Sequence, residues 1–211
     1  MSEADCIFVS HHPLVRHKLT RLRDRATEPW QFRELVRALS QLLFYEATHD
    51  LRLEPWTVQT PLAEHTGQRI AERIGLFPIL RAGLGMADAI LELVPSACVW
   101  HLGLYRDHQT LRPVTYYNKL PANAAIDLAL VVDPMLATGG SATTAIGILK
   151  EAGLQRIKLL GLIAAPEGLQ LLARTHPDVP IHIGAIDSHL DEHSYIVPGL
   201  GDAGDRQFGT H

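Results

Sequence analysis

The sequence lacks the marks of a secreted or membrane protein. It has only two cysteines, Cys6 and Cys98, which lie far apart and form no pair with metal-ligand spacing, as is usual in a reducing cytosol. No apolar run approaches the roughly 20 residues that span a membrane. The opening residues, MSEADCIFVSHH, lack the basic and apolar regions of a secretion signal. We therefore expect a cytoplasmic protein with no membrane partner.

An excess of basic charge is also missing. Lys and Arg number 19 against 23 Asp and Glu, a formal net charge of −4, so we expect no nucleic-acid partner. The 12 histidines include no HExxH pair, and the adjacent His11 and His12 give no reason to expect a structural metal. With 46% hydrophobic and 20% charged residues, the 211-residue chain is typical of one globular domain over residues 1–211.

The most informative stretch is ALVVDPMLATGGS, Ala129–Ser141. The apolar run over 126–132 predicts a buried parallel strand. Asp133 stands where that strand should end, and Pro134 cannot donate to a strand ladder. A turn of small residues then leads into a helix predicted over 142–152.

This order of strand, acid, glycine-rich turn and helix suits phosphate binding. The glycines let backbone N–H groups converge, the helix N-terminus adds unpaired donors, and Thr138 and Ser141 add hydroxyls. The turn has no Walker lysine, so it would hold a monophosphate with amides and hydroxyls. Asp133 suits sugar hydroxyls or a metal. The pattern therefore indicates a ribose 5-phosphate, and an ordinary strand–turn–helix corner is the alternative.

The string DPMLATGGS, Asp133–Ser141, resembles the phosphoribosyl-diphosphate (PRPP) loop of type I phosphoribosyltransferases, and within them the uracil branch. Many relatives carry a second acid where Pro134 stands and another Asp where Ala137 stands, but the uracil branch departs in this way too. The resemblance covers nearly the whole chain. It implies an α/β fold with a mostly parallel sheet flanked by helices, a β-hairpin flap and an N-terminal helical arm.

A second strand–glycine turn–helix follows the same plan. A short strand predicted at 76–80 runs into RAGLG, Arg81–Gly85, and a helix is predicted over 86–93. The spacing indicates a second anion site on the same sheet edge, with a plain strand–helix turn as the alternative. RAGLG resembles the family's pyrophosphate loop, which implies that Arg81 is a pyrophosphate ligand.

A hairpin is predicted between these two turns. The strand predicted at 99–105 pairs with strand-like 110–120, in which Pro113 favours an edge position. Arg106 falls at the tip, where an exposed charge is the alternative to a ligand contact. The resemblance implies a flap over the site at about 104–121, with Arg106 contacting PRPP.

The rest of the chain alternates strands and helices, which predicts a parallel sheet with ligands beyond the carboxyl ends of its strands. The basic residues of the first helix, Arg23 among them, are interpreted as a solvated face, with an anion or effector site as the alternative. The expected elements are a strand at 7–9, helices at 15–25 and 31–48 in an arm of about 1–60, a strand or edge hairpin at 51–60, a connecting arm at 62–73, strands at 156–165 and 181–186, and a helix at 166–175.

The C-terminal segment does not look disordered. Four glycines fall from Gly199 to Gly209 among aliphatic residues, which predicts an ordered loop that brings backbone amides against a planar ligand. A docked terminus without function is the alternative. YIVPGLGDAGDRQFGT resembles the family's uracil-recognition loop, at about 191–211. The resemblance implies uracil contacts from Tyr195, Ile196, Gly201, Asp202 and Ala203.

The resemblance implies transfer of the phosphoribosyl group of PRPP to uracil, giving UMP and pyrophosphate. The implied catalytic residues are Asp133, Arg81, Arg106 and Asp202, the last near the sugar or Mg²⁺. No residue is assigned as general base. The implied PRPP contacts are Arg81, Arg106, Asp202 and the loop residues Asp133, Pro134, Met135, Leu136, Ala137, Thr138, Gly139, Gly140 and Ser141.

Three further expectations rest on the resemblance alone. Mg²⁺ should arrive with PRPP or pyrophosphate, with its ligands unassigned. GTP activates some relatives and is a candidate effector, and a homo-oligomer of at least two chains is expected. The alternative function is a catalytically silent, pyrimidine-sensing regulator or RNA-binding attenuator. The low basicity and the presence of both Arg81 and Arg106 argue against it.

Overall fold

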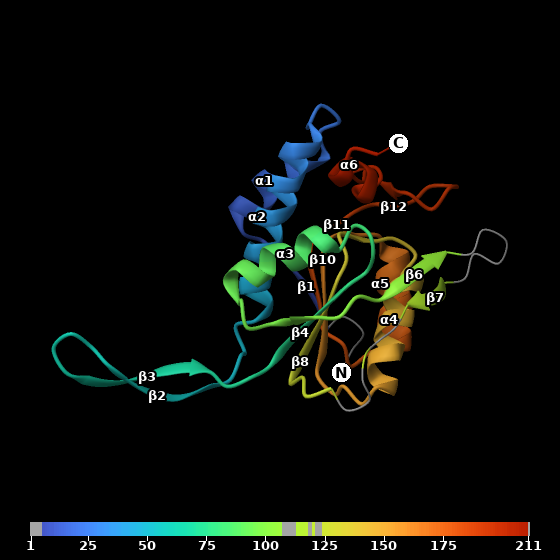
Figure 1. Ribbon diagram of the computed structural model, residues 1–211. Helices are drawn as coiled ribbons and strands as arrows, with labels where there is room; N and C mark the ends of the chain where they lie inside the picture. The colour runs from blue at the N-terminus through green and yellow to red at the C-terminus, as the bar shows by residue number, and fades with distance from the viewer. Residues whose placement is uncertain (1–5, 107–112, 118–119, 121–123, 211) are drawn as a thin grey trace.

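A computed structural model describes residues 6–106, 113–117, 120 and 124–210. A parallel sheet with helices on both faces forms its centre (Figure 1), which confirms the predicted fold class. The strands lie in the order β1-β11-β10-β8-β4-β5, and the short strand β9 pairs with β10. Their bounds are Ile7–Val9 for β1, Ile74–Pro78 for β4, Cys98–Val99 for β5, Leu128–Val132 for β8, Met135–Leu136 for β9, Ile157–Ala164 for β10 and Ile181–Ile186 for β11.

The central strands are buried along their whole length. Every residue of β4, β8 and β10 is buried, because helices cover both faces and leave no polar side to the sheet. The strands predicted at 126–132 and 156–165 are both present. Pro78 at the end of β4 lies opposite Val132 at the end of β8. The segments that follow these two strands therefore leave the sheet side by side at one edge.

One face of the sheet is covered by α1 (Pro13–Arg23), α2 (Pro29–Ala47) and α3 (Leu84–Leu93). A proline at the first helical position begins both α1 and α2. Their buried side chains, such as the fully buried Phe32, share one core with β4 and β8. The predicted arm over 1–60 is not confirmed: α1 and α2 form a layer of the domain, and β1 pairs with β11 in the sheet.

The other face is covered by α4 (Gly140–Glu151) and α5 (Pro166–Thr175). Their side chains, including Ile146 and Leu169, form a second core with the opposite faces of β8 and β10. The helix predicted at 166–175 is confirmed, and α4 begins two residues before its predicted start. The small residues of the turn are thus partly inside the helix.

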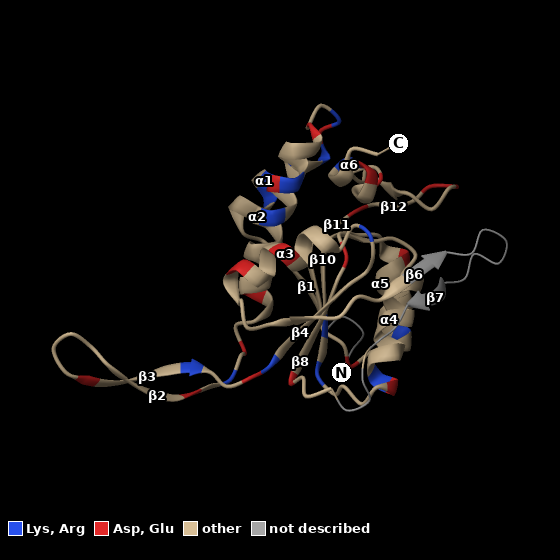
Figure 2. Ribbon diagram, in the orientation of Figure 1, with Lys and Arg blue, Asp and Glu red and all other residues tan. Residues whose placement is uncertain are grey.

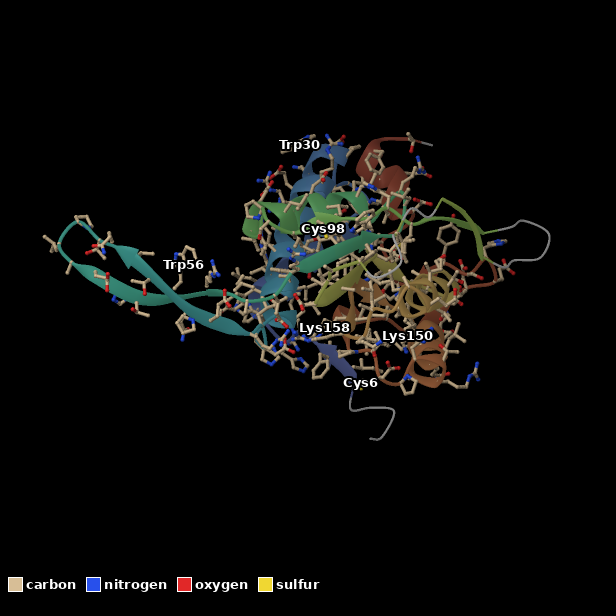
Figure 3. The ribbon with its side chains drawn as sticks, turned by 60° about the horizontal axis from the view of Figure 1, so that its bottom comes forward. Cys6, Trp30, Trp56, Cys98, Lys150 and Lys158 are labelled. Atoms are coloured by element: carbon tan, nitrogen blue, oxygen red, sulfur yellow. The ribbon has the colours of Figure 1, made fainter. Side chains whose placement is uncertain are left out.

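A long hairpin projects away from this body (Figure 1). It pairs β2, Leu53–Gln59, with β3, Glu64–Ile70, in antiparallel register. The predicted connecting arm at 62–73 is therefore wrong, because most of it is the second strand of the hairpin. Trp56 lies on the projecting hairpin (Figure 3), with the guanidinium of Arg69 3.8 Å from its ring centroid.

A second hairpin follows α3. The strand predicted at 99–105 is divided into β5 and β6 (Gly103–Arg106), and β6 pairs antiparallel with β7 (Pro113–Tyr117). Pro113 thus lies at the start of a strand in a two-stranded sheet, where a missing donor costs little. The tip, residues 107–112, lies outside the described residues, and the flap role of this hairpin stays a prediction.

The C-terminal segment is ordered, as predicted, but it is not only a loop. It contains the short pair β12 (His189–Leu190) and β13 (Ile196–Val197) and the helix α6 (Ala203–Phe208). Ala203 is fully buried and Gln207 is 2% exposed. Helix α6 packs against α2 near the carboxyl edge of the sheet (Figure 1).

The charged residues of α1 are all Lys or Arg, whereas α2 carries both signs (Figure 2). Among the described residues, no cluster of three or more His, Cys, Asp or Glu side chains is placed to hold a metal. In that same part of the chain, every helix is too short or too polar to cross a bilayer.

Candidate active site

The predicted phosphate loop lines a pocket at the carboxyl end of β8. Asp133 and residues 135–142 surround it. The loop is fastened to β10 from behind, because the carbonyl of Pro134 accepts from the backbone N–H groups of Leu162 and Ile163 at 3.1 and 3.0 Å. Pro134 therefore supports the pocket and does not line it.

Glycine is needed where the loop turns into α4. Gly139 has a φ of +81° and lies directly before the helix, a conformation that residues with a Cβ rarely adopt. A Cβ there would lie 2.9 Å from the carbonyl oxygen of Gly168 in α5. A Cβ on Gly168 would lie 2.4 Å from the oxygen of Ala137. The loop and α5 thus touch through backbone, and the first residues of α4 line the pocket.

Asp133 contributes the acid of the pocket. Its backbone N–H donates to Leu160 at 3.1 Å, so the strand pairing continues to this residue. Burial raises the pKa of Asp133 to about 7, although a hydrogen bond from the Met135 N–H, at 3.4 Å, lowers it. A half-buried carboxyl group beside a phosphate cradle suits the hydroxyls of a ribose.

The RAGLG turn lies at the neighbouring strand end, as predicted. It follows β4, and α3 begins at Leu84. The Arg81 guanidinium donates from Nη2 to Asp205 Oδ1 at 2.9 Å and lies 3.5 Å from Thr210 Oγ1 through Nη1. The Arg81 side chain is 58% exposed. A fork of N–H donors at this edge can bind a diphosphate.

Among the residues predicted to contact uracil, Asp202 lies beside Arg81, whereas Ile196 and Ala203 are buried. Asp202 caps α6 by accepting from the Asp205 N–H at 2.9 Å, and a Cβ on Gly204 would meet both Asp202 Oδ1, at 3.2 Å, and Arg81 Nη2, at 3.6 Å. Asp202 and Arg81 are thus brought together. Ile196 and Ala203 are buried, at 7% and 0% exposure, and their predicted contacts with uracil stay predictions.

The remaining predicted residues are less closely placed. Tyr195 is 50% exposed beside β13. Gly201 has a φ of +76° and lines a separate hollow with Asp202 and residues of α6. Arg106 ends β6, and its side chain lies outside the described residues. The predicted contacts of Tyr195 and Arg106 with ligands stay predictions.

Three side chains near the site were missed or misread from the sequence. Arg23 is not on a solvated face, because it forms an ion pair with Asp187 at 2.5 Å and donates to the Gly199 carbonyl at 2.8 Å. It thereby fastens α1 to the predicted uracil-recognition segment at Gly199. Asp205 and Thr210 were not predicted, although the second acid of GDAGDR was a visible signal for Asp205.

The fold and this site define a class. A hypoxanthine-guanine phosphoribosyltransferase from Bacillus anthracis is similar in fold, with a TM-score of 0.50, 11% identity, and coverage of 75% of this chain and 80% of that one. The AQ2163 protein of Aquifex aeolicus matches with a TM-score of 0.90, 36% identity, and coverage of 96% and 97%. The parallel sheet with its phosphate-type loop is that of the type I phosphoribosyltransferases.

Sequence comparison identifies the branch. The model of the uracil phosphoribosyltransferase family matches residues 9–210. The uracil phosphoribosyltransferase of Roseiflexus sp. (strain RS-1) is 69% identical over 97% of this chain and 98% of its own length. That of Thermoanaerobacter sp. (strain X514) is 56% identical with the same coverage. The chain belongs to the uracil phosphoribosyltransferase family.

Proposed function

We propose that the protein transfers the phosphoribosyl group of PRPP to uracil, giving UMP and pyrophosphate. Family membership over residues 9–210 supports the reaction. The observation that carries it to particular residues is the pocket of Asp133 and residues 135–142, next to the turn of Arg81. It combines a phosphate cradle, an acid for the sugar and a cation for the leaving group at one edge.

In this reaction the bond from ribose C1 to a pyrophosphate oxygen breaks, and a bond from C1 to uracil N1 forms. Positive charge develops on the ribose and negative charge on the leaving group, so groups that are already oriented lower the barrier. The cradle would fix the 5-phosphate and with it the position of C1. Asp133 would hold ribose hydroxyls, and Arg81 and Arg106 would bind the pyrophosphate. The N1 proton of uracil is released, and no residue is assigned to accept it.

Mg²⁺ is part of the proposal, carried with the diphosphate. The carboxylates present fit an ion that arrives with its substrate. Asp133 lines the pocket and Asp202 lies near Arg81. Among the described residues, no group of three or more acids, His or Cys is placed to hold a metal. Mg²⁺ usually keeps several waters and takes one or two carboxylates plus phosphate oxygens. When bound, the ion would neutralise charge on the leaving pyrophosphate.

Uracil recognition is assigned to the backbone of the C-terminal segment. Backbone N–H and C=O groups of Ile196, Gly201 and Ala203 would bind the edge of uracil. Asp187 accepts from the Gly199 N–H at 2.9 Å and so orders the segment. A loop built to match the alternating carbonyl and N–H groups of uracil would reject cytosine, because unpaired buried groups are costly.

We also propose a homo-oligomer, in which the projecting hairpin contacts a second copy. The hairpin exposes apolar side chains on both strands, namely Leu53, Trp56, Val58 and Ile70, and such surface in a soluble enzyme marks an interface. Light scattering after size exclusion tests this, with Trp56→Ser expected to shift the mass toward one chain. An unchanged mass would remove the hairpin from the interface.

GTP activation and a cytoplasmic location complete the proposal. GTP rests on the family resemblance, and rates measured with and without GTP test it. The location is supported by the free thiols of Cys6 and Cys98, which persist in reducing compartments.

The decisive experiment is pyrophosphate release from PRPP with uracil, with cytosine and with no base. We expect release that depends on uracil, and UMP in equal amount. The alternative, a silent regulator or RNA-binding attenuator, has no support in the comparisons, since the matched relatives bear the name of the enzyme. Binding of uracil without turnover would restore it.

A further inference from the structure

Helix α6 contacts the RAGLG turn, Arg81–Gly85, through several side chains. Besides the 2.9 Å ion pair between Asp205 Oδ1 and Arg81 Nη2, the Gln207 Nε2 donates to the Ala82 carbonyl at 3.3 Å. A Cβ on Gly85 would lie only 2.7 Å from Gln207 Oε1. Helix α6, which is part of the predicted uracil-recognition segment at about 191–211, is therefore packed directly on the turn assigned to pyrophosphate.

The carboxylate of Asp205 is itself held in place. Thr210 Oγ1 donates to Asp205 Oδ1 at 2.7 Å, and the chain can return there because Gly209 adopts a φ of +67° after α6. The Gly209 N–H donates to the Asp205 carbonyl at 2.7 Å, and the Asp205 N–H donates to Asp202. Asp205 is thus anchored through its side chain and through its backbone.

Arg81 depends on this anchor for its orientation. Within the described part of the chain, Asp205 and Thr210 are the hydrogen-bond partners of its guanidinium. Its side chain is 58% exposed. Asp205 occupies one end of the planar fork, which leaves further N–H donors of the guanidinium for a ligand.

We propose that Asp205 and Thr210 are positioning residues for Arg81 in pyrophosphate binding. Asp205 fixes the fork before PRPP arrives, so binding does not have to order a flexible arginine. Its negative charge opposes the diphosphate, but an ion pair this exposed is screened by water, and the gain in order outweighs the repulsion. The inference rests on the proposed role of Arg81. The contact of Asp205 with Arg81 also joins the predicted uracil-recognition segment to the RAGLG turn through α6.

The first test is Asp205→Asn, which keeps the shape and removes the charge. We expect the KM for PRPP and the inhibition constant of pyrophosphate to rise by about 3–10-fold, the usual cost of ordering one long side chain. The KM for uracil and the melting temperature should change little. The matched control is Glu92→Gln, which removes the charge of a similarly exposed ion pair with Arg37, 2.5 Å long and on the far part of α3. It should leave all constants unchanged.

A double-mutant cycle with Arg81→Ala tests whether Asp205 acts through Arg81. In the Arg81→Ala background, Asp205→Asn should have almost no further effect on the KM for PRPP. An equal effect in both backgrounds, or no effect in either, would overturn the positioning role. If Arg81→Ala itself leaves PRPP kinetics unchanged, then the assigned role of Arg81 fails, which is a different result.

Thr210→Val provides a second route, because it leaves the capping of α6 untouched. It removes the hydroxyl that anchors Asp205, so we expect the same rise in the KM for PRPP, by about 2–3-fold. Should Asp205→Asn fail to fold, this variant decides: a rise that disappears in the Arg81→Ala background supports the proposal, and an unchanged KM overturns it.

Discussion

Asp50 and Asp133 lie at opposite ends of the parallel strands, and their pKa values are shifted in opposite directions. We call the side where the strands begin the amino edge and the side where they end the carboxyl edge. At the amino edge, burial raises the pKa of Asp50, but hydrogen bonds from Lys158 and Arg156 outweigh burial and bring it down to about 2. At the carboxyl edge, burial raises the pKa of Asp133 to about 7, and the backbone bond from Met135 does not offset it. In the described part of the chain, Asp50 therefore has cationic partners and Asp133 has none.

The charged side chains at the amino ends of the strands form ion pairs and hydrogen bonds with one another. The fully buried carboxylate of Glu72 accepts from the N–H and Nε of Arg52, at 3.0 and 2.9 Å, and from Arg156. Lys158 donates to Asp50 and to the Ala47 carbonyl at 2.6 Å, beside the base of the projecting hairpin (Figure 3). These bonds join α2, the hairpin and β10, so this edge serves the fold.

The carboxyl edge leaves its charges available. Among the described residues, Asp133 accepts one hydrogen bond, from the Met135 N–H at 3.4 Å, and Arg81 has exposed N–H donors beside its ion pair. Perturbed and incompletely paired groups in a cleft are typical of functional sites. Both aspartates are affected by burial, so burial alone does not identify the active site. The carboxylate of Asp133 is distinguished by the lack of a cationic partner among the described residues.

The largest expected effect is a loss of stability on breaking the ion pairs at the amino edge. Glu72→Gln leaves Arg52 and Arg156 without their shared buried carboxylate and should lower the free energy of unfolding by about 3–5 kcal/mol. The fraction that stays folded should keep its KM for PRPP. Urea denaturation and kinetics on the folded protein measure both. A stable variant with impaired PRPP binding would reverse the roles of the two edges.

At the carboxyl edge, Gly139→Val should weaken PRPP binding by about 100-fold or more, equal to roughly 3 kcal/mol. A β-branched residue resists the φ of +81°, and its Cβ would meet the Gly168 carbonyl. Gly140→Val is the matched comparison, since Gly140 already lies in α4 without a positive φ. Calorimetric titration with PRPP gives both affinities. Equal losses in the two variants would show that backbone conformation is not the cause.

Asp133→Asn should lower kcat/KM by about 10–100-fold, because one charge-assisted bond to the ribose contributes about 1.5–3 kcal/mol. The Asn side chain keeps the shape of the pocket, so circular dichroism should be unchanged. Steady-state rates with saturating uracil provide the measurement. Wild-type turnover in this variant would remove Asp133 from the reaction.

The smallest expected effect concerns stability against pH. Because the folded pKa of Asp133 is raised, the folded chain holds a proton more tightly than the unfolded chain between pH 4 and 7, so this group lowers stability as pH rises through that range. Asp133→Asn should therefore be more stable than wild type at pH 8, by about 1–2 kcal/mol in a pocket open to water, with the gain vanishing near pH 4. Thermal melts across pH test this. A gain independent of pH would assign it to packing instead.

Much of the fold could be predicted because its signals are local. The buried run before Asp133 and the helix at 166–175 were found from composition and a starting proline. β3 was missed because EHTGQRI has no apolar alternation, and it becomes a strand by pairing with β2. The pair of Arg23 with Asp187 joins residues 164 positions apart, which no local pattern could indicate.

The sequence by itself determined the chemistry at the strand ends. The acid, the glycine turn and the RAGLG arginine each follow a buried strand, and parallel strands must present such turns at one edge. Only the tertiary structure decided which charges meet. Asp50 lies against Lys158, and Asp133 lines a pocket. Which of these surroundings an aspartate has depends on the distant segments that pack against it, and that packing sets each pKa through burial and neighbouring charge.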